Sequence, residues 1–335
     1  MKVSIKKVDK TKTTDFSQIM TTATLSGDTG SVARKLEFTV VTSETDTAIP
    51  KVKLTAGNKV SLSSGRTKLF EGFIFTFSQS HSSDNISYTA YDPLIYLMKN
   101  EGAYNFKKTT AEAVAKKVLA DFKLPVGKLA KTKIAYKRIH IGVSLYSIIM
   151  HSYAQAAKQN GKKYIMTFTG GKINVIEKGE VVRNFTLQNK VNLTESNYSF
   201  SIESMVNAVV IVDKKGKRIG EIKNKKWIKT YGRLQKIYQQ EKKSKKNNSK
   251  LQSNTAKKAA AEMQGPEKQA SVTSLGDIRC VCGRGVNLKD TYTGLTGRFW
   301  ISADSHTFEQ DAVLGEYSHT MDLTLEYKNI MDSGG

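Results

Sequence analysis

Three segments within the last sixty residues have the alternating pattern of β-strands: GDIRCVCGRGVNLKD (Gly276–Asp290), YTGLTGRFWISADSHTF (Tyr292–Phe308) and YSHTMDLTLEYKNIMD (Tyr317–Asp332). In the second segment Phe299, Ile301 and Ala303 share one face, and the apolar residues of Met321–Leu325 do the same in the third. Each strand is therefore expected to bury one face only. The segments contain no nucleophile motif, metal cluster or phosphate-binding loop, which directs the search for a function away from catalysis.

The register of a hairpin between the second and third segments decides what their histidines do. If the polar residues 309–316 form the turn, the apolar faces match when Met321 lies opposite Ala303. That register puts His306 and His319 on opposite faces of the sheet. A metal site shared by the two rings is therefore disfavoured, and each imidazole is expected to be an ordinary hydrogen-bonding strand residue.

The length and composition of the chain are those of a soluble protein with several domains. It has 335 residues, of which 39% are hydrophobic, which is enough for about two or three domains that each bury a core. The first ten residues, MKVSIKKVDK, contain charge but lack the apolar region of a signal peptide. No apolar run approaches the roughly twenty residues that a membrane span needs, so we expect neither Sec export nor membrane insertion.

Cys280 and Cys282 are the only cysteines in the chain. They lie two residues apart in a predicted strand, so their side chains are expected to point the same way. A disulfide at that spacing would be strained, and a structural zinc site needs about four ligands. We therefore expect two reduced thiols in a protein made in the cytosol.

The formal net charge of +23 is concentrated in one part of the chain. Residues Lys214–Lys258 hold 17 lysines and arginines against two acidic residues, Glu221 and Glu241. Most of these cations are lysines, which make less directional phosphate contacts than arginine does. The segment is either a solvated insertion or a surface for an anionic partner. The candidate partner-binding residues are Lys225, Lys226, Lys229, Arg233, Lys236, Lys242, Lys243, Lys245 and Lys246.

Residues 1–92 are predicted to form a first β-barrel domain, because short alternating segments are separated there by turns rich in glycine, serine and asparagine. The three phenylalanines of Phe73–Phe77 share one face of a strand, and we expect this stripe in the barrel core. Asp92-Pro93 ends the pattern, because proline cannot donate to a strand ladder.

Residues 93–192 are predicted to form an α+β middle domain with two helices and a β-hairpin. Thr109 and Glu112 have the spacing of a capping box at the start of the first helix. Gly170-Gly171 suits a tight hairpin turn. The helices and the hairpin are expected at 109–122, 144–159 and 163–177.

Residues 193–335 are predicted to form a second β-barrel domain. A Lys-rich insertion at about 227–270 interrupts it, and the three terminal strands complete it. The fold class expected for the whole chain is therefore mainly β with a smaller α+β part, in which two β-barrel-like domains flank an α+β domain.

Several stretches of the chain resemble one known protein family. They are Tyr91–Asn100, Tyr231–Gln235, Leu275–Asp277, Gly294–Gly297, Ser305–Thr307 and Met321–Leu325. In order and spacing they are similar to the baseplate hub proteins of contractile phage tails, in the XkdQ/YqbQ-like branch of PBSX-type prophage elements. The chain is also similar to late control D-type hub proteins. The resemblance covers nearly the whole chain, although each motif alone consists mostly of turn and strand residues.

The resemblance implies an architecture and a set of partners. Such hubs resemble a trimeric ring in which two β-barrel domains per chain surround a channel and join a hexameric tail tube to a trimeric spike. The implied partners are the chain itself as a homotrimer, the tail tube protein and the central spike protein, with the tape measure protein and the baseplate wedge as further candidates. The implied location is a virion or a phage-tail-like particle such as a tailocin, assembled in the bacterial cytoplasm. No cofactor and no catalytic or metal-binding side chain is implied.

Two other functions compete with this structural role. A peptidoglycan hydrolase of a tail tip would need a thiolate beside a histidine, or two carboxylates across a cleft, and neither pattern is evident. A nucleic-acid-binding channel protein would use the Lys-rich insertion, where Trp227, Tyr231 and Tyr238 interleave with lysines and could stack on bases. Nucleic acid is otherwise expected only in transit or in weak nonspecific contact.

Overall fold

The structure, a computed structural model, describes residues 1–9, 12–43, 46–80, 84–240, 249–311 and 315–331. The chain divides into two compact units, one made of Met1–Ser196 with Ser271–Gly335 and the other of Asn197–Ala270. Strands dominate the first unit, and its helices lie in its middle part. The predicted fold class, mainly β with a smaller α+β part, is confirmed. The predicted domain boundaries at residues 92 and 192 stay predictions.

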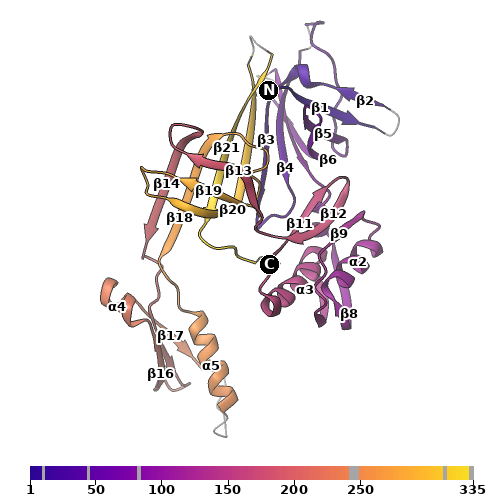
Figure 1. Cartoon of the computed structure of the whole chain (residues 1–335). Coiled ribbons are helices and arrows are strands. Elements are labelled where there is room, and N and C mark those ends of the chain that lie inside the picture. The colour runs from indigo at the N-terminus through magenta and orange to yellow at the C-terminus, as the bar shows by residue number, and fades with distance from the viewer. Residues whose placement is uncertain (10–11, 44–45, 81–83, 241–248, 312–314, 332–335) are drawn as a thin grey trace. The chain divides into compact units, whose positions relative to one another are not determined.

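Thirteen strands of the described chain join in one sheet (Figure 1). Its main path has the order β14-β18-β21-β20-β3-β4-β7-β6-β5-β1-β2, and β19 pairs with both β20 and β13 beside this path. The ladders between the described strands do not close into a complete ring, although an isolated bridge between Asn189 and Leu193 connects the end of β13 to the start of β14. The strands are β1 (Val3–Val8), β2 (Thr13–Asp15), β3 (Met20–Asp28), β4 (Lys35–Val41), β5 (Lys59–Ser64), β6 (Thr67–Gln79), β7 (Asn85–Tyr91), β13 (Val181–Gln188), β14 (Leu193–Ser201), β18 (Glu267–Leu275), β19 (Gly285–Lys289), β20 (Thr296–Gln310) and β21 (Tyr317–Glu326).

The long strand β20 connects the two ends of the sequence. Along its length it pairs with β19, β21 and β3. The ladder with β3 runs from Ala303 opposite Asp28 to Glu309 opposite Thr22. Segments from both ends therefore bury their apolar side chains together. The core of this part of the sheet includes Ile5, Leu25, Phe38, Leu62, Ile74 and Phe308.

A β-bulge sets the register of the hairpin between β20 and β21. Leu325 lies opposite Ile301, whereas Thr324 lies opposite Ala303, so Ser302 is an extra residue on β20. An extra residue moves every later side chain of the strand to the other face. The pattern of burial therefore changes phase at this point of β20.

The predicted hairpin is present, but its predicted register is wrong. Met321 lies opposite His306 instead of Ala303. The prediction continued a single alternation through the bulge, which the polarity of the residues does not reveal. The buried residues of β20 are Phe299 and Ile301 before the bulge, and Asp304, His306 and Phe308 after it.

The phenylalanines of β6 neither share one face nor lie in the core, contrary to the prediction, because a bulge at Phe75 interrupts the alternation. Ile74 is 1% exposed, whereas Phe75 and Phe77 are 37% and 51% exposed. Ile74 lies opposite the buried Ala90, and after the bulge Phe77 lies opposite the buried Tyr88, so Phe77 is on the core-facing side of β6 but beyond its buried part. The ring centroid of Phe75 lies 5.5 Å from that of Tyr91 and 6.2 Å from that of Tyr96. These rings cover part of the outer surface of the sheet.

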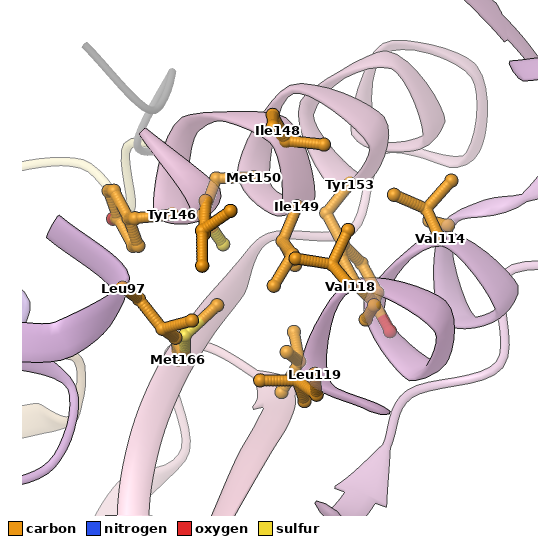
Figure 2. Close-up of a cluster of buried hydrophobic side chains, with 14 of the residues drawn as sticks. Leu97, Val114, Val118, Leu119, Tyr146, Ile148, Ile149, Met150, Tyr153 and Met166 are labelled. Carbon is orange, nitrogen blue, oxygen red and sulfur yellow. The ribbon is translucent and has the colours of Figure 1, made fainter. Parts of the chain in front are cut away.

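The middle part of the first unit packs helices against two small sheets, β10-β8 and β11-β12-β9. Figure 2 shows Val118 and Leu119 of helix α2 and Ile149 and Tyr153 of helix α3 pointing into a shared core. The two predicted helices and the hairpin turned at Gly170-Gly171 are present. The elements are α1 (Ile95–Lys99), β8 (Glu101–Thr110), α2 (Ala111–Asp121), β9 (Val126–Leu129), β10 (Ala135–Ser144), α3 (Leu145–Asn160), β11 (Tyr164–Thr169) and β12 (Lys172–Glu177).

The start of α2 differs from the predicted capping box. The side chain of Thr110, and not of Thr109, accepts a hydrogen bond from the N–H of Ala113 at 3.4 Å. The carboxylate of Glu112 instead accepts the backbone N–H and the hydroxyl of Thr132 at 3.0 and 2.8 Å. Glu112 therefore fastens α2 to the segment between β9 and β10.

The second unit is a three-stranded sheet with two helices. The strand order is β16-β15-β17, with β16 antiparallel and β17 parallel to β15. Val209 and Ile211 of β15 form a small apolar core with Ala259 of α5. No helix in the described part of either unit is long and apolar enough to cross a membrane. The elements are β15 (Ala208–Val212), β16 (Arg218–Lys223), α4 (Lys225–Tyr231), β17 (Gln235–Gln239) and α5 (Ser249–Ala261).

Candidate functional site

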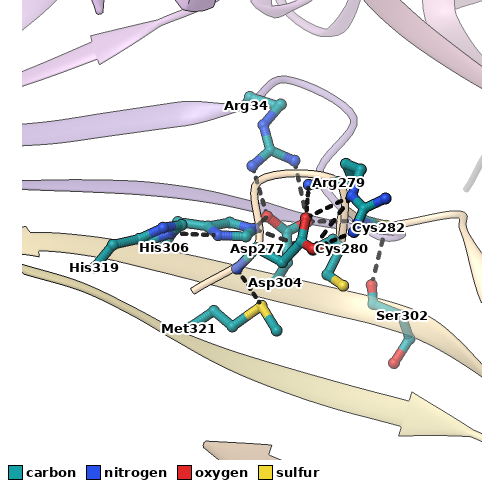
Figure 3. Close-up of polar contacts among 10 residues, drawn as sticks. All are labelled: Arg34, Asp277, Arg279, Cys280, Cys282, Ser302, Asp304, His306, His319 and Met321. Carbon is teal, nitrogen blue, oxygen red and sulfur yellow. Dashed lines mark hydrogen bonds and ion pairs between the residues drawn. The ribbon is translucent and has the colours of Figure 1, made fainter. Parts of the chain in front are cut away.

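A buried ion pair lies at the centre of a polar cluster in the first unit (Figure 3). Arg34 donates from Nη1 and Nη2 to the two carboxylate oxygens of Asp304, at 3.0 and 2.5 Å. The side chain of Asp304 is fully buried and also accepts the backbone N–H of Cys282 at 2.6 Å. Paired donors of this kind are the strongest arrangement for a carboxylate. The ion pair therefore ties the start of β4 to β20 and to the connection between β18 and β19.

His306 and His319 hydrogen-bond to each other, which contradicts their predicted separation on opposite faces. Nδ1 of His306 lies 3.1 Å from Nε2 of His319, and Nε2 of His306 lies 3.0 Å from the carbonyl oxygen of Cys280. A carbonyl oxygen only accepts, so Nε2 of neutral His306 carries the proton. His319 must then donate to Nδ1 of His306. The bulge in β20 brings the rings together by changing the phase of that strand.

Burial disfavours the charged form of both imidazoles. Desolvation lowers the pKa of His306, although the carboxylate of Asp304, 3.5 Å away, opposes this shift. Desolvation and the neighbouring His306 lower the pKa of His319 to about 4. A Cβ atom at Gly276 would lie 2.2 Å from the His319 ring, so only glycine leaves room for it. The pair is therefore a packed, uncharged part of the sheet near neutral pH.

The side chains of this cluster are engaged with one another. Within the described residues, no group of three or more histidine, cysteine, aspartate or glutamate side chains could hold a metal ion. Both ring nitrogens of His306 are already used in hydrogen bonds. The cluster can therefore position strands, but it presents no lone pair of His306 to an ion or a substrate.

The structure places Cys280 and Cys282 in a loop between β18 and β19, and not in the predicted strand. The expectation that the two cysteine side chains point the same way assumed a strand, so it does not apply here. Both thiols are free, and Cys282 donates from Sγ to the carbonyl oxygen of Ser302 at 3.2 Å. Burial raises the pKa of each thiol to about 12. Neither is a competent nucleophile near neutral pH, because the thiolate is the reactive form.

We expect both thiols to resist modification in the folded protein. A pKa of about 12 leaves very little thiolate at pH 8, so labelling by a disulfide reagent should be at least about a hundredfold slower than in the unfolded chain. Absorbance at pH 8 with and without guanidinium measures both rates. The unfolded chain should release two equivalents and Cys282→Ser one. Rapid labelling of the folded protein would contradict the burial of these groups.

A cavity of about 430 Å³ lies beside the polar cluster, within the first unit. Arg34, Cys282 and His306 line it from the cluster, and strand β11 lines it from the middle part. Its size and largely apolar lining are typical of sites that hold a ligand or a peptide side chain. Asp92, also in the lining, is 3% exposed, and burial raises its pKa to about 7. The other cationic lining residues are Lys68, Lys178, Arg279 and Arg284.

Three of the predicted partner-binding residues lie on one short helix of the second unit. Lys225, Lys226 and Lys229 belong to α4, whose first turn is capped by the side chain of Asn224. Lys225 and Lys229 are four residues apart, so they share a helix face. None of the three forms an ion pair with another described residue.

Two other predicted partner-binding residues form ion pairs with carboxylates of the same unit. Arg233 forms an ion pair with Glu221, and Lys236 forms one with Glu262. Hydrogen bonds from Lys223 and Arg233 lower the pKa of Glu221 to about 2. These cations are therefore partly neutralised within the unit. The remaining predicted residues lie outside the described part of the chain: Lys242, Lys243, Lys245 and Lys246.

The aromatic residues proposed to stack on bases all contact the chain itself. The ring of Trp227 packs on Gly265, where a Cβ atom would lie 3.0 Å from it. The rings of Tyr231 and Phe200 have centroids 6.2 Å apart. Tyr238 packs on the small core of the second unit. The three rings therefore serve the packing of this unit.

Sequence reasoning did not identify Arg34 and Asp304. They are 270 residues apart, and no local pattern relates them. Because the bulge changes the phase of β20, the sequence pattern also did not show that Asp304 faces inward. One signal was available, because a carboxylate between apolar residues in a strand needs a cationic partner if it is buried.

Comparison with known proteins assigns the chain to a family. Residues 23–326 match the family model described as YqbQ-like. The chain belongs to the YqbQ-like family. The match spans β3 to β21, so it includes both strands of the ladder that joins the two ends of the sequence. The resemblance inferred from the sequence motifs is thereby confirmed.

Relatives of this YqbQ-like chain come from phage elements and related systems. It is 26% identical over 315 residues to the phage-like element PBSX protein XkdQ of Bacillus subtilis, which covers 92% of this chain and 93% of that protein. The 43 kDa tail protein of prophage MuSo2 from Shewanella oneidensis has a TM-score of 0.68 at 15% identity and 99% coverage of both chains. The E. coli c3393 protein has a TM-score of 0.52 at 10% identity and covers 99% of this chain and 78% of its own. It is described as a type VI secretion system component similar to T4 tail proteins gp27 and gp5. These structures share the fold of the YqbQ-like chain.

Proposed function

We propose that this YqbQ-like chain is the structural hub of a contractile tail baseplate, a ring adaptor between the tail tube and the central spike. The observation that carries the proposal is the family match over residues 23–326. A fold shared along 99% of the chain with a prophage tail protein supports it. The continuous sheet supports it as well, because strands from both ends of the sequence make one body that can present fixed surfaces.

In this proposal three copies form a ring. Residues 1–92 and 193–335 supply two barrel-like domains per chain, and residues 93–192 supply the middle domain. Contacts between neighbours in such a ring join different surfaces and must close after three steps. The tail tube and central spike proteins bind on either side, with the tape measure protein and the baseplate wedge as neighbours. The ring belongs to a virion or tailocin and assembles in the cytoplasm.

Electron cryomicroscopy of intact particles tests the proposal. We expect this chain at the junction of tube and spike, in three copies. Mass photometry of the purified protein mixed with tube or spike protein should likewise detect trimers, which form on the spike if not alone. A strict monomer that ignores both partners would falsify the proposal. Reproducible lysis of cell walls by the purified protein would instead favour a peptidoglycan hydrolase.

The lysines of the second unit are proposed to contact an anionic partner. The support is the concentration of 17 basic residues in Lys214–Lys258 and the absence, among described residues, of ion pairs to the α4 lysines. Replacing Lys225, Lys226 and Lys229 by glutamine should weaken binding to DNA and lower its salt slope by about three if the partner is nucleic acid. Binding that is measured by fluorescence anisotropy at several salt concentrations gives this slope. An unchanged slope would leave an acidic protein surface as the partner.

A further inference from the structure

The edge of strand β11 borders the cavity in the first unit. β11 is the outer strand of the β11-β12-β9 sheet, and all six of its residues line the cavity. An edge strand presents backbone N–H and C=O groups that have no partner in its own sheet. The cavity and these groups therefore lie together.

The pairing register shows which backbone groups face the open edge. Thr169 and Lys172 flank the two-residue turn Gly170-Gly171, so they form a hydrogen-bonded pair. Such pairs recur at every second residue of an antiparallel ladder. The N–H and C=O groups of Met166 and Phe168 therefore point away from β12 and toward the open edge.

One position on this edge is already occupied. The N–H of Tyr164 lies 3.1 Å from Sδ of Met331, in the segment that follows β21. No backbone hydrogen bond among the described residues reaches the outward groups of Met166 and Phe168. Met166 is only 2% exposed, whereas Phe168 is half-buried. The accessible part of the edge therefore lies at Phe168 and can accept one further residue of an extended chain.

The cavity adds apolar volume and positive charge to this edge. Lys68 and Arg279 line it but already pair with Glu71 and Asp277. Arg284 also lines it, and its side chain forms no ion pair with another described residue. A negatively charged group on the occupant would therefore find its complement at Arg284.

We propose that an extended segment of a partner protein pairs with the open edge of β11 and places apolar side chains and a carboxylate in the cavity. This inference rests on the proposed function, because the partner is another protein of the same particle. Addition of a strand supplies backbone hydrogen bonds, and pockets for alternate side chains supply selectivity. A lipid or a small carboxylic acid would fill the cavity but leave the edge groups unused, which favours a polypeptide.

Substitutions at Phe168 separate the role of the edge from that of the side chain. Proline removes the outward N–H of Phe168, and a strand tolerates it where that N–H makes no ladder bond. Phe168→Ala loses the same ring but keeps the N–H, so it is the matched control. Relative to alanine, Phe168→Pro should lower the amount of this chain in purified particles about tenfold, the effect of roughly one or two lost hydrogen bonds. Equal incorporation of two variants that melt alike would overturn the proposal.

Photo-crosslinking gives an independent readout that does not depend on the proline variant. A benzophenone amino acid at Thr169 is activated in intact particles and in the isolated protein, and cross-linked peptides are sequenced by mass spectrometry. We expect one apolar segment with an acidic residue, from a different particle protein, in the particles only. Cross-links to a small amphiphile, to a second copy of this chain or to nothing would each refute the inference. If the chain is missing from the particles altogether, the proposed function fails instead.

Discussion

Replacing Arg34 with alanine is expected to lower the free energy of unfolding by about 3–5 kcal/mol, the usual cost of removing one partner of a buried ion pair. The change leaves the fully buried carboxylate of Asp304 without its guanidinium. Denaturant titration followed by circular dichroism measures the effect. Lys35→Ala is the control, because the ion pair of Lys35 with Glu37 is exposed and its loss should cost less than about 0.5 kcal/mol.

A double variant tests whether the charge or the packing dominates. Arg34→Met with Asp304→Leu removes both charges, and buried ion pairs replaced by apolar residues are often nearly neutral in stability. The double variant should therefore recover most of the stability lost in Arg34→Ala, except for the hydrogen bond to Cys282. A loss of less than about 1 kcal/mol in Arg34→Ala would contradict the central role assigned to this ion pair.

Acid is expected to destabilise the protein as the pH falls from about 6.5 toward 4, because two histidines are held neutral by burial. The pKa of His319 is lowered to about 4 by desolvation and by His306. The pKa of His140 is lowered to about 4 by desolvation, by Arg138 and by His151, whose ring lies 5.7 Å away. Unfolded histidine has a pKa of about 6.5, so the unfolded chain binds more protons in this range. Their contribution to stability is complete above pH 6.5 and is lost toward pH 4.

The loss is expected to be several kcal/mol, since each pKa unit corresponds to roughly 1.4 kcal/mol per imidazole. Unfolding free energies at pH 7, 6 and 5 give the change of stability with pH. This pH range lies above the pKa of most carboxylates. In His140→Phe with His319→Phe the slope between pH 6.5 and 5 should become much shallower, and His306 and Asp92, whose shifts act in opposite directions on stability, are the remaining contributors. A slope that is the same in this variant and in the parent would rule out these histidines as its cause.

Local patterns predicted much of the middle part of the chain. The apolar spacing of α2 and α3 and the turn at Gly170-Gly171 each depend on residues a few positions apart. The predicted N-cap of α2 was one residue too early, because Thr109 and Thr110 have the same side chain. Glu112 does not complete a capping box, because its carboxylate binds Thr132 instead. Such errors are small because helix geometry fixes the neighbours.

Strand phase was harder to predict. The bulge at Ser302 changes the face of every later residue of β20, and no residue type marks it. At β6 the spacing of Phe73, Phe75 and Phe77 suggested one core face, but a bulge at Phe75 breaks the alternation and Ile74 is the residue that is buried. The predicted fold class is still correct, because it depends only on where strands occur in the sequence. The polar cluster was missed because it depends on which face of each strand a side chain occupies.

Charge was visible in the sequence, but its pairing was not. The concentration of lysines in the second unit follows directly from the residue types. Whether Arg233 or Lys236 is available to a partner depends on Glu221 and Glu262, which only the folded chain brings to them.

The ladder between β3 and β20 has a consequence for how the protein is made. During synthesis β3 leaves the ribosome long before its partner exists, and at about 5–20 residues per second the delay is tens of seconds. Throughout this time the nascent chain carries an unpaired strand edge, which is prone to pair with other chains. Completion of the sheet therefore has to wait for the last part of translation, and premature assembly with a neighbour has to be avoided until then.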